Sequence, residues 1–231
     1  MHKFNKFLVA IAVYLTFTFG SAFAFGGFSF GVSGSTVDFE TDGREEETSG
    51  DNETTKTSVS KTVEVPGFFL EYTGGGDGSG PGFTIGLEFI PGEASIGTKS
   101  RTDANDISTD DGTYTGKAEV QDHATLYIEP TYFFSDSMGM YLKAGISAVT
   151  VNSLESISNG DDDSAYGNKD VLGAMGGLGF KARHASGLFM KLEGTKTVYE
   201  HITLQSTTGN KNRITAEPEA TALKLAIGYN F

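Results

Sequence analysis

The chain has 231 residues, a length that fits one domain of ordinary size. Its formal net charge of −13 excludes a nucleic-acid-binding protein, which needs a basic face, and the absence of cysteine excludes disulfides and thiolate metal sites. The abundance of Gly (31), Phe (18) and Tyr (9) beside only 5 Pro favours strands and turns over helices.

The first 24 residues have the three parts of a secretory signal peptide. Lys3 and Lys6 supply a short basic region, and residues 7–19 are an unbroken run of apolar residues and Thr. Ala22 and Ala24 then form an Ala-x-Ala cleavage signal. We therefore predict a signal peptide at 1–24 and one mature domain at 25–231, with a net charge of −15. A membrane anchor is the alternative, but the run is short and no charged stop-transfer cluster follows.

The mature chain consists of eight segments in which apolar and polar residues alternate, as expected of β-strands with one apolar face. In chain order, the apolar positions are Phe28, Phe30 and Val32; Val59, Val63, Val65, Phe68, Leu70 and Tyr72; Phe83, Ile85, Leu87 and Phe89; Val120, Ala124, Leu126, Ile128 and Tyr132; Met140, Leu142, Ala144 and Ile146; Leu172, Ala174, Leu178 and Phe180; Leu188, Met190, Leu192 and Val198; and Leu223, Leu225, Ile227, Tyr229 and Phe231. The apolar parity changes at Pro66 and Gly67, which predicts a bulge or kink there.

The connections between these segments alternate in length. The short ones, 74–81, 135–139 and 185–187, are rich in Gly, Ser or Asp, whereas the long ones are 40–58, 99–112, 153–170 and 200–219. The long connections contain 19 acidic and 7 basic residues. This alternation is typical of a transmembrane barrel with short periplasmic turns and long outer loops, here acidic. An even number of strands places both termini on the periplasmic side.

A sheet can cross a bilayer only if it closes, because every backbone donor and acceptor must be satisfied within the protein. The segments supply the ~9–11 residues that a spanning strand needs. The apolar face is expected to contact lipid and the polar face to line an interior that eight strands leave just wide enough for side chains. The sequence thus predicts an all-β fold, an eight-stranded antiparallel transmembrane β-barrel.

Eight charged residues fall on the predicted inward face, four acidic and four basic. They are Glu71, Glu88, Glu129, Glu193, Lys143, Lys181, Lys191 and Lys224. Buried charges are tolerated mainly when they are paired, so the balance predicts a plug of ion pairs without an open pore. A soluble sheet whose charged face meets water is the alternative.

Aromatic residues gather at the predicted periplasmic ends of the strands. They are Phe28, Tyr72, Phe83, Tyr132, Phe180, Tyr229 and Phe231. Such residues form a girdle at the membrane interface of transmembrane barrels. The alternative is that they are the core aromatics of a β-sandwich.

With its signal peptide, alternating strands and C-terminal strand, the chain resembles the small OmpA/OmpX-type outer-membrane β-barrel family. In that family the final strand ends in Phe after aromatic or aliphatic residues at alternate positions, as do Leu225, Ile227, Tyr229 and Phe231 here. The resemblance implies a place in the outer membrane of a Gram-negative-type bacterium, surrounded by lipid and lipopolysaccharide. It also implies that the barrel-assembly machinery reads the strand ending at Phe231. Because the sequence stops there, wall anchoring through an appended peptidoglycan-binding domain is not expected.

Some members of the family modify lipid A, so the histidines need to be considered as catalytic groups. His123 shares a polar face with Glu119 and Gln121, but no Gly-x-Ser-x-Gly element accompanies it. His184 adjoins a short turn and His201 adjoins a long loop, where solvated residues are normal. We therefore predict no catalytic residues and no enzymatic activity.

The acidic loops offer oxygen ligands for hard cations at 161–163 and 103–106, although neither has the spacing of an EF-hand loop. We predict no specific metal or cofactor site and keep divalent cations as a candidate partner of the loops. Asn159-Gly160 and Asp111-Gly112 are interpreted as turn chemistry.

The favoured function is that of a structural or surface-interaction barrel. The alternatives are a narrow solute channel, a lipid A-modifying enzyme and a soluble lipocalin-like binding barrel.

Overall fold

The computed structural model describes residues 26–46, 54–76, 78–103, 112–157, 166–207 and 213–231. The predicted signal peptide at 1–24 lies outside these residues. The elements are β1 (Gly26–Glu46), β2 (Thr54–Gly75), β3 (Gly80–Asp103), β4 (Gly112–Phe133), β5 (Met138–Ile157), β6 (Gly167–Arg183), β7 (Leu188–Tyr199), β8 (Ile202–Gln205) and β9 (Arg213–Asn230). Within the described ranges, no helix is long and apolar enough to cross a membrane.

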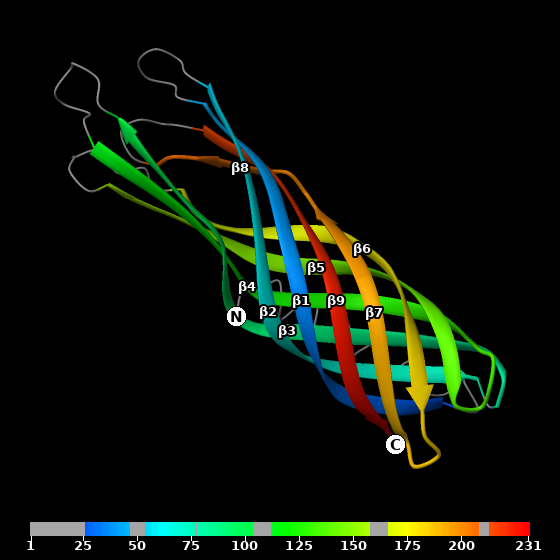
Figure 1. Cartoon of the computed structure of the whole chain (residues 1–231). Helices are drawn as coiled ribbons and strands as arrows, with labels where there is room; N and C mark the ends of the chain where they lie inside the picture. The colour runs from blue at the N-terminus through cyan, green and yellow to red at the C-terminus, as the bar shows by residue number, and fades with distance from the viewer. Residues whose placement is uncertain (1–25, 47–53, 77, 104–111, 158–165, 208–212) are drawn as a thin grey trace.

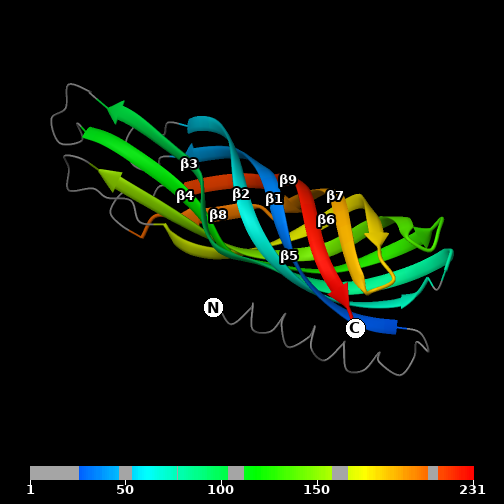
Figure 2. The same ribbon diagram turned by 60° about the horizontal axis from the view of Figure 1, so that its bottom comes forward.

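The strands form one closed antiparallel sheet, which confirms the predicted eight-stranded barrel (Figures 1 and 2). Each strand from β1 to β6 pairs with the next, β7 pairs with β9, and β9 pairs with β1 to close the ring. Strand β8 has four residues and pairs only with β9, beyond the end of β7. Eight strands therefore make the barrel wall, and β8 prolongs it along the path of β7.

The short connections between β2 and β3, β4 and β5, and β6 and β7 lie together at one end of the barrel (Figure 1). Both ends of the described chain are at this end, where the amide of Phe231 donates to the carbonyl of Phe28 at 2.9 Å. Arg183 ties the turns to one another: its guanidinium donates to the carbonyls of Gly76, Gly78 and Asp136 at 2.6–2.7 Å. We call this the periplasmic end.

An apolar belt surrounds the periplasmic half of the barrel, as the alternating pattern predicts. Large exposed apolar side chains come from every barrel strand; examples are Phe30, Leu70, Phe83, Ile128, Leu142, Leu178, Leu192 and Leu225. Six of the seven predicted girdle aromatics are exposed in the structure. The seventh, Tyr72, is buried and its ring packs edge-on against Phe28 at a centroid distance of 5.1 Å.

The strands continue well beyond this belt, so the predicted long loops are shorter than the sequence indicated. Strands β1 to β5 each have 20–24 residues, whereas ~9–11 suffice to cross a bilayer. Much of 40–58 and 200–219 is strand. Outside the membrane the outward face of the sheet meets water instead of lipid, so among the described residues there the outward apolar residues that mark a spanning strand are largely absent. The extended strands form a projection at the end opposite the turns.

Two details of register differ from the prediction. Pro66 and Gly67 pair in unbroken register with Gly34 and Ser33, so β2 has no bulge against β1. Register shifts occur instead in β3 against β4, between Ile90 and Glu93 and between Ser95 and Gly97, and in β4 against β5, between Gln121 and Ala124. The shift in β4 lies around Asp122, which has a φ of 55°. An Asp tolerates this left-handed conformation better than most residues.

Substitutions at two glycines of β1 test how this strand packs in the closed barrel. A Cβ at Gly31 would lie 2.2 Å from the Phe69 ring and 2.4 Å from the Ile227 carbonyl oxygen, whereas a Cβ at Gly34 meets nothing within 4 Å. We expect Gly31→Val to destabilise the barrel by more than the ~1–3 kcal/mol of ordinary overpacking, because a backbone atom must move. Gly34→Val is the matched control and is expected to be neutral. The measurement is the urea midpoint of heat-modifiable gel mobility; equal midpoints for the two variants would contradict the register.

Candidate functional site

The periplasmic half of the barrel interior is filled by charged side chains. All eight residues predicted to face inward are buried: Glu71, Glu88, Glu129, Glu193, Lys143, Lys181, Lys191 and Lys224. Their formal charges cancel, and salt bridges connect them across the barrel. We call these eight residues the charged plug.

Lys191 of β7 is the centre of one half of the plug. Its Nζ lies 2.5 Å from Glu71 Oε1 of β2 and 2.6 Å from Glu129 Oε1 of β4. The hydroxyl of Tyr127 donates to the same Glu71 oxygen at 2.7 Å. Lys181 approaches Glu71 Oε2 at 3.8 Å and lies over the Phe189 ring, a cation–π position.

Glu193 of β7 organises the other half of the plug. It accepts from Lys143 at 2.9 Å, from Lys224 at 3.2 Å and from the Tyr141 hydroxyl at 2.8 Å. Lys224 also pairs with Glu88, which accepts from Ser33 at 3.0 Å. Lys143 links the two halves through Glu129 at 3.3 Å. The network therefore spans the interior and leaves no unpaired charge among its eight members.

The interior changes character above the plug. A buried apolar cluster fills the projection end of the barrel and consists of Val37, Val149, Val151, Val171, Tyr199, Ile202 and Ala220. Val63, Val65 and Val120 pack against it. The expectation that the apolar face always meets lipid is therefore wrong here: on β2 the interior itself becomes apolar above Gly67. The apolar residues of β2 change from the outward to the inward face at Pro66 and Gly67 because the interior is apolar beyond this point.

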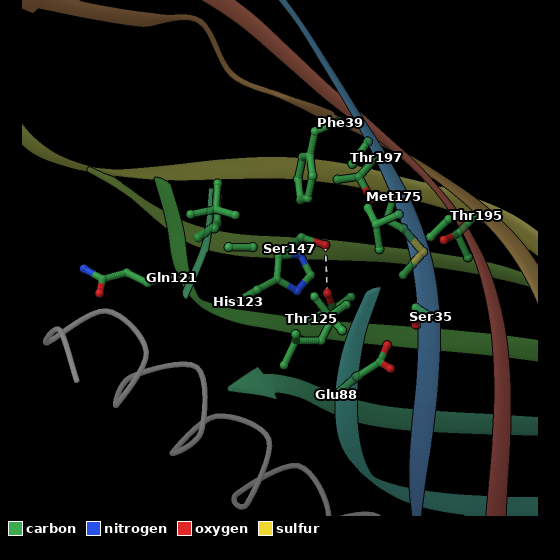
Figure 3. Close-up of a pocket in the computed structure, with 18 of the residues that line it drawn as sticks. Ser35, Phe39, Glu88, Gln121, His123, Thr125, Ser147, Met175, Thr195 and Thr197 are labelled. Atoms are coloured by element: carbon green, nitrogen blue, oxygen red, sulfur yellow. Dashed lines mark hydrogen bonds between the residues drawn. The ribbon is translucent and has the colours of Figure 1, made fainter. Parts of the chain in front are cut away.

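A cavity of about 80 Å³ lies between the charged plug and the apolar cluster (Figure 3). Its walls include Val37, Val65, Ile90, Val149 and Met175, and its polar side includes Glu88, His123, Thr125, Ser147 and Lys224. The volume suits a few waters or part of a slender molecule. Figure 3 shows His123, Thr125 and Ser147 near its centre, with the hydroxyls of Thr125 and Ser147 2.8 Å apart.

His123 belongs to this cavity because of the bulge in β4. It pairs with the inward Ile90, and its Nε2 is 3.1 Å from the Tyr199 hydroxyl. Glu119 and Gln121, which the alternation placed on the same face as His123, lie beyond the register shift. Gln121 instead donates to Asn152 at 3.1 Å. The three side chains therefore do not share one strand face as predicted, although Gln121 and His123 both contribute to the lining of the cavity.

The other candidate residues of the sequence do not meet at one site. His184 bonds Ser186 within its turn at 2.9 Å, and the exposed His201 pairs with Glu217 at 2.7 Å. The acidic stretches 161–163 and 104–106 lie outside the described residues, as do Asn159-Gly160 and Asp111. In the described part of the chain, no three His, Asp or Glu side chains are grouped to hold a metal ion.

An acidic surface lies on the outer face of the projection, which sequence reasoning had assigned to loops. Glu40 is directly opposite Glu219, and Asp42 is opposite Glu217, across the β1–β9 pairing. Like charges in opposite positions destabilise a sheet. Among the described residues, Lys196 pairs with Glu219 and the His201 ring contacts Glu217, whereas Glu40 and Asp42 have no cationic partner. We call these four acidic residues the acidic patch.

Comparison with known proteins gives fold similarity at low identity. No family model and no curated protein matches the chain. Among solved structures, the outer membrane protease OmpT from Escherichia coli matches with a TM-score of 0.52 and 8% identity, over 89% of this chain and 97% of that chain. Two further matches are OprG from Pseudomonas aeruginosa (0.40, 11% identity, 87% and 96%) and Ail from Yersinia pestis (0.31, 13%, 87% and 99%).

The closed ladder, the apolar belt and the inward charges together define a class of protein. The chain has the fold of a small outer-membrane β-barrel of the OmpA/OmpX type. Its exterior is compatible with hydrocarbon only over the belt, so the belt marks where membrane lipid contacts the barrel. The protein is therefore an outer-membrane protein of the Gram-negative type.

The plug can be tested by removing its most connected lysine. Lys191→Met leaves Glu71 and Glu129 without their shortest ion pairs. Breaking a buried pair in this way costs about 3–5 kcal/mol. The exposed pair of Lys196 with Glu219 provides the control, Lys196→Met, which should cost under about 1 kcal/mol. Urea unfolding in lipid vesicles measures both, and a loss below 1 kcal/mol for Lys191→Met would show that the plug is not held as described.

Proposed function

We propose that the protein is a non-catalytic, closed barrel that anchors an acidic projection at the bacterial surface. The observation that supports this most directly is the charged plug, since it occupies the barrel cross-section with side chains that bond one another. Conducting a solute through it would require several buried ion pairs to separate at once, which is costly.

The proposal that the barrel is non-catalytic rests on its histidines. A hydrolytic site needs a histidine that joins a nucleophilic hydroxyl to an orienting carboxylate. His123 bonds Tyr199, His184 bonds a serine of its own turn, and His201 pairs with Glu217. In the described ranges, no histidine is bonded to both partners.

The projection supports a role in surface contact. Strand pairing holds β1 to β2 as far as Glu46 and, with two register shifts, β3 to β4 as far as Asp103, so the backbone of each pair is ordered along the projection. The acidic patch keeps unfavourable like-charge neighbours on that surface. We propose that it attracts a cationic partner, and that divalent cations loosely bound there help to bridge lipopolysaccharide.

Assembly is expected to use the last strand. Outward-facing Leu225, Ile227 and Tyr229 alternate along β9, and Phe231 is 79% exposed at its end. We propose that the barrel-assembly machinery reads these side chains before β9 pairs with β1 and β7.

Planar bilayer recordings test whether the barrel is closed. The protein should give no stable conductance steps, because the plug spans the interior. A general porin reconstituted in parallel serves as the positive control. Stable, stepwise conductance by the unmodified protein would overturn the closed barrel and favour the narrow solute channel.

Binding of a decalysine peptide tests the acidic patch. Glu40→Gln combined with Glu219→Gln should weaken salt-sensitive binding several-fold, because the local field of the patch is halved. Glu64→Gln combined with Glu93→Gln removes two exposed charges elsewhere on the projection and is the matched control. Equal losses for the two double variants would mean that net charge, rather than the acidic patch, governs contact.

A further inference from the structure

The barrel wall has a segment without backbone pairing. Strands β2 and β3 pair over only eight residue pairs, from Phe68 with Phe89 to Gly75 with Gly82. Beyond them β2 remains paired with β1, and β3 with β4. Within these described strands, 54–67 and 90–103 therefore face each other without a hydrogen-bond ladder. We call this the β2–β3 seam; Figure 1 shows the β1–β2 and β3–β4 ribbons rising separately.

The sequence itself ends the ladder. Pro66 on β2 and Pro91 on β3 stand next to the last pairs, and proline has no N–H to donate. Gly92 has a φ of 95°, and the register of β3 against β4 shifts between Ile90 and Glu93. Both edges of the seam thus carry residues that prevent strand pairing.

The seam begins where the apolar belt ends. On β2 the outward Phe68 and Leu70 are exposed and apolar, whereas the outward Glu64 is exposed and charged. An unpaired sheet edge cannot face hydrocarbon, because its backbone groups would be unsatisfied. The start of the seam is therefore at the level where the outer lipid leaflet meets water.

The interior cavity reaches the seam from inside. Its lining includes Val65 from the β2 edge and Ile90, Pro91, Gly92 and Ala94 from the β3 edge. Towards the periplasmic end the cavity stops at the ion pair of Glu88 with Lys224. Towards the projection it meets the apolar cluster. The side that faces the seam is thus the one not closed by the plug or the cluster.

One polar atom of a residue that lines the cavity has no hydrogen-bond partner in the described part of the chain. Nδ1 of His123 is buried and has no hydrogen-bond partner among the described residues, while Nε2 is engaged with Tyr199. The nearest charges, Glu88 and Lys224, neutralise each other. A ligand that fits these walls is neutral, mostly hydrocarbon, slender, and equipped with one hydrogen-bonding group.

We propose that the β2–β3 seam admits such a molecule, a neutral single-chain alcohol or carbonyl compound dissolved in the outer leaflet, into the cavity. Its chain lies against Val65, Ile90 and Met175, and its polar group bonds His123 Nδ1. This site is separate from the acidic patch and does not depend on the surface-contact function.

A disulfide across the seam tests the route. A Cβ at Gly97 would lie 3.6 Å from Val59 Cβ, within the ~3.5–4.5 Å that a disulfide spans. The natural chain has no cysteine, so Val59→Cys with Gly97→Cys gives a single defined bridge. The reduced double variant and the oxidant-treated single variant Val59→Cys are the matched controls, and heat-modifiable mobility confirms that each is folded.

The probe is 1-decanol carrying a diazirine on its chain, added to the protein in phosphatidylcholine vesicles, photolysed and mapped by peptide mass spectrometry. We expect labelling at Ile90 and Met175 that falls at least fivefold on oxidation and returns on reduction. Labelling of the belt residues Leu142 and Leu178 should not change. Absence of label at Ile90 and Met175, or label there that is insensitive to the disulfide, would overturn the proposal.

A second pair of variants keeps the test independent of disulfide formation. Ala222 lines the cavity, so Ala222→Phe should fill it and lower the interior labelling at least fivefold. Ala144 is exposed on the outer face, and Ala144→Phe is the control that should leave interior labelling intact. Equal interior labelling of the two folded variants would contradict binding in this cavity.

Discussion

The need to satisfy every backbone hydrogen bond inside the bilayer is the constraint on which this structure depends. It requires the eight strands to close into a barrel through the β1–β9 pairing. It also explains why backbone pairing is interrupted only outside the bilayer. The pairing of β2 with β3 is complete beside the apolar belt and ends at Phe68 and Phe89. Above that level water can serve the free edges, so Pro66 and Pro91 are tolerated there.

Closing so few strands leaves an interior that side chains must fill, and here the fill is charged below and apolar above. An apolar fill throughout would give each spanning strand two apolar faces and hence continuous hydrophobic runs. Charged inward residues preserve the alternation of apolar and polar residues along each strand. A chain with this alternation can cross the aqueous periplasm before it inserts. The cost of burying them is met by mutual pairing, in which Lys191 and Glu193 each hold two or more partners.

Much of this arrangement could be predicted because period-two alternation is a local signal. The eight strands, the short turns and the inward position of all eight plug residues follow from it. Which charges pair could not be predicted, since Lys191 reaches Glu71 and Glu129 from strands far apart in the chain. The bulge at Asp122 also escaped, because a single residue with φ of 55° reverses the facing of all residues before it. On the neighbouring strand β3, the Pro91–Gly92 pair was the sequence signal of irregular pairing with β4.

The interior above the plug is apolar, contrary to the rule that the apolar face of each strand contacts lipid. The edges of the seam adjoin this apolar interior. Unpaired edges invite pairing with other chains, and natural proteins blunt them with proline, charge and irregular backbone. Here Pro66, Pro91 and Gly92 supply these, and Val59 closes against Gly97 by side-chain contact. A contact of this kind can open without breaking backbone hydrogen bonds. The wall therefore lacks a backbone ladder beside the cavity, while the charged side chains of the plug fill the interior below it.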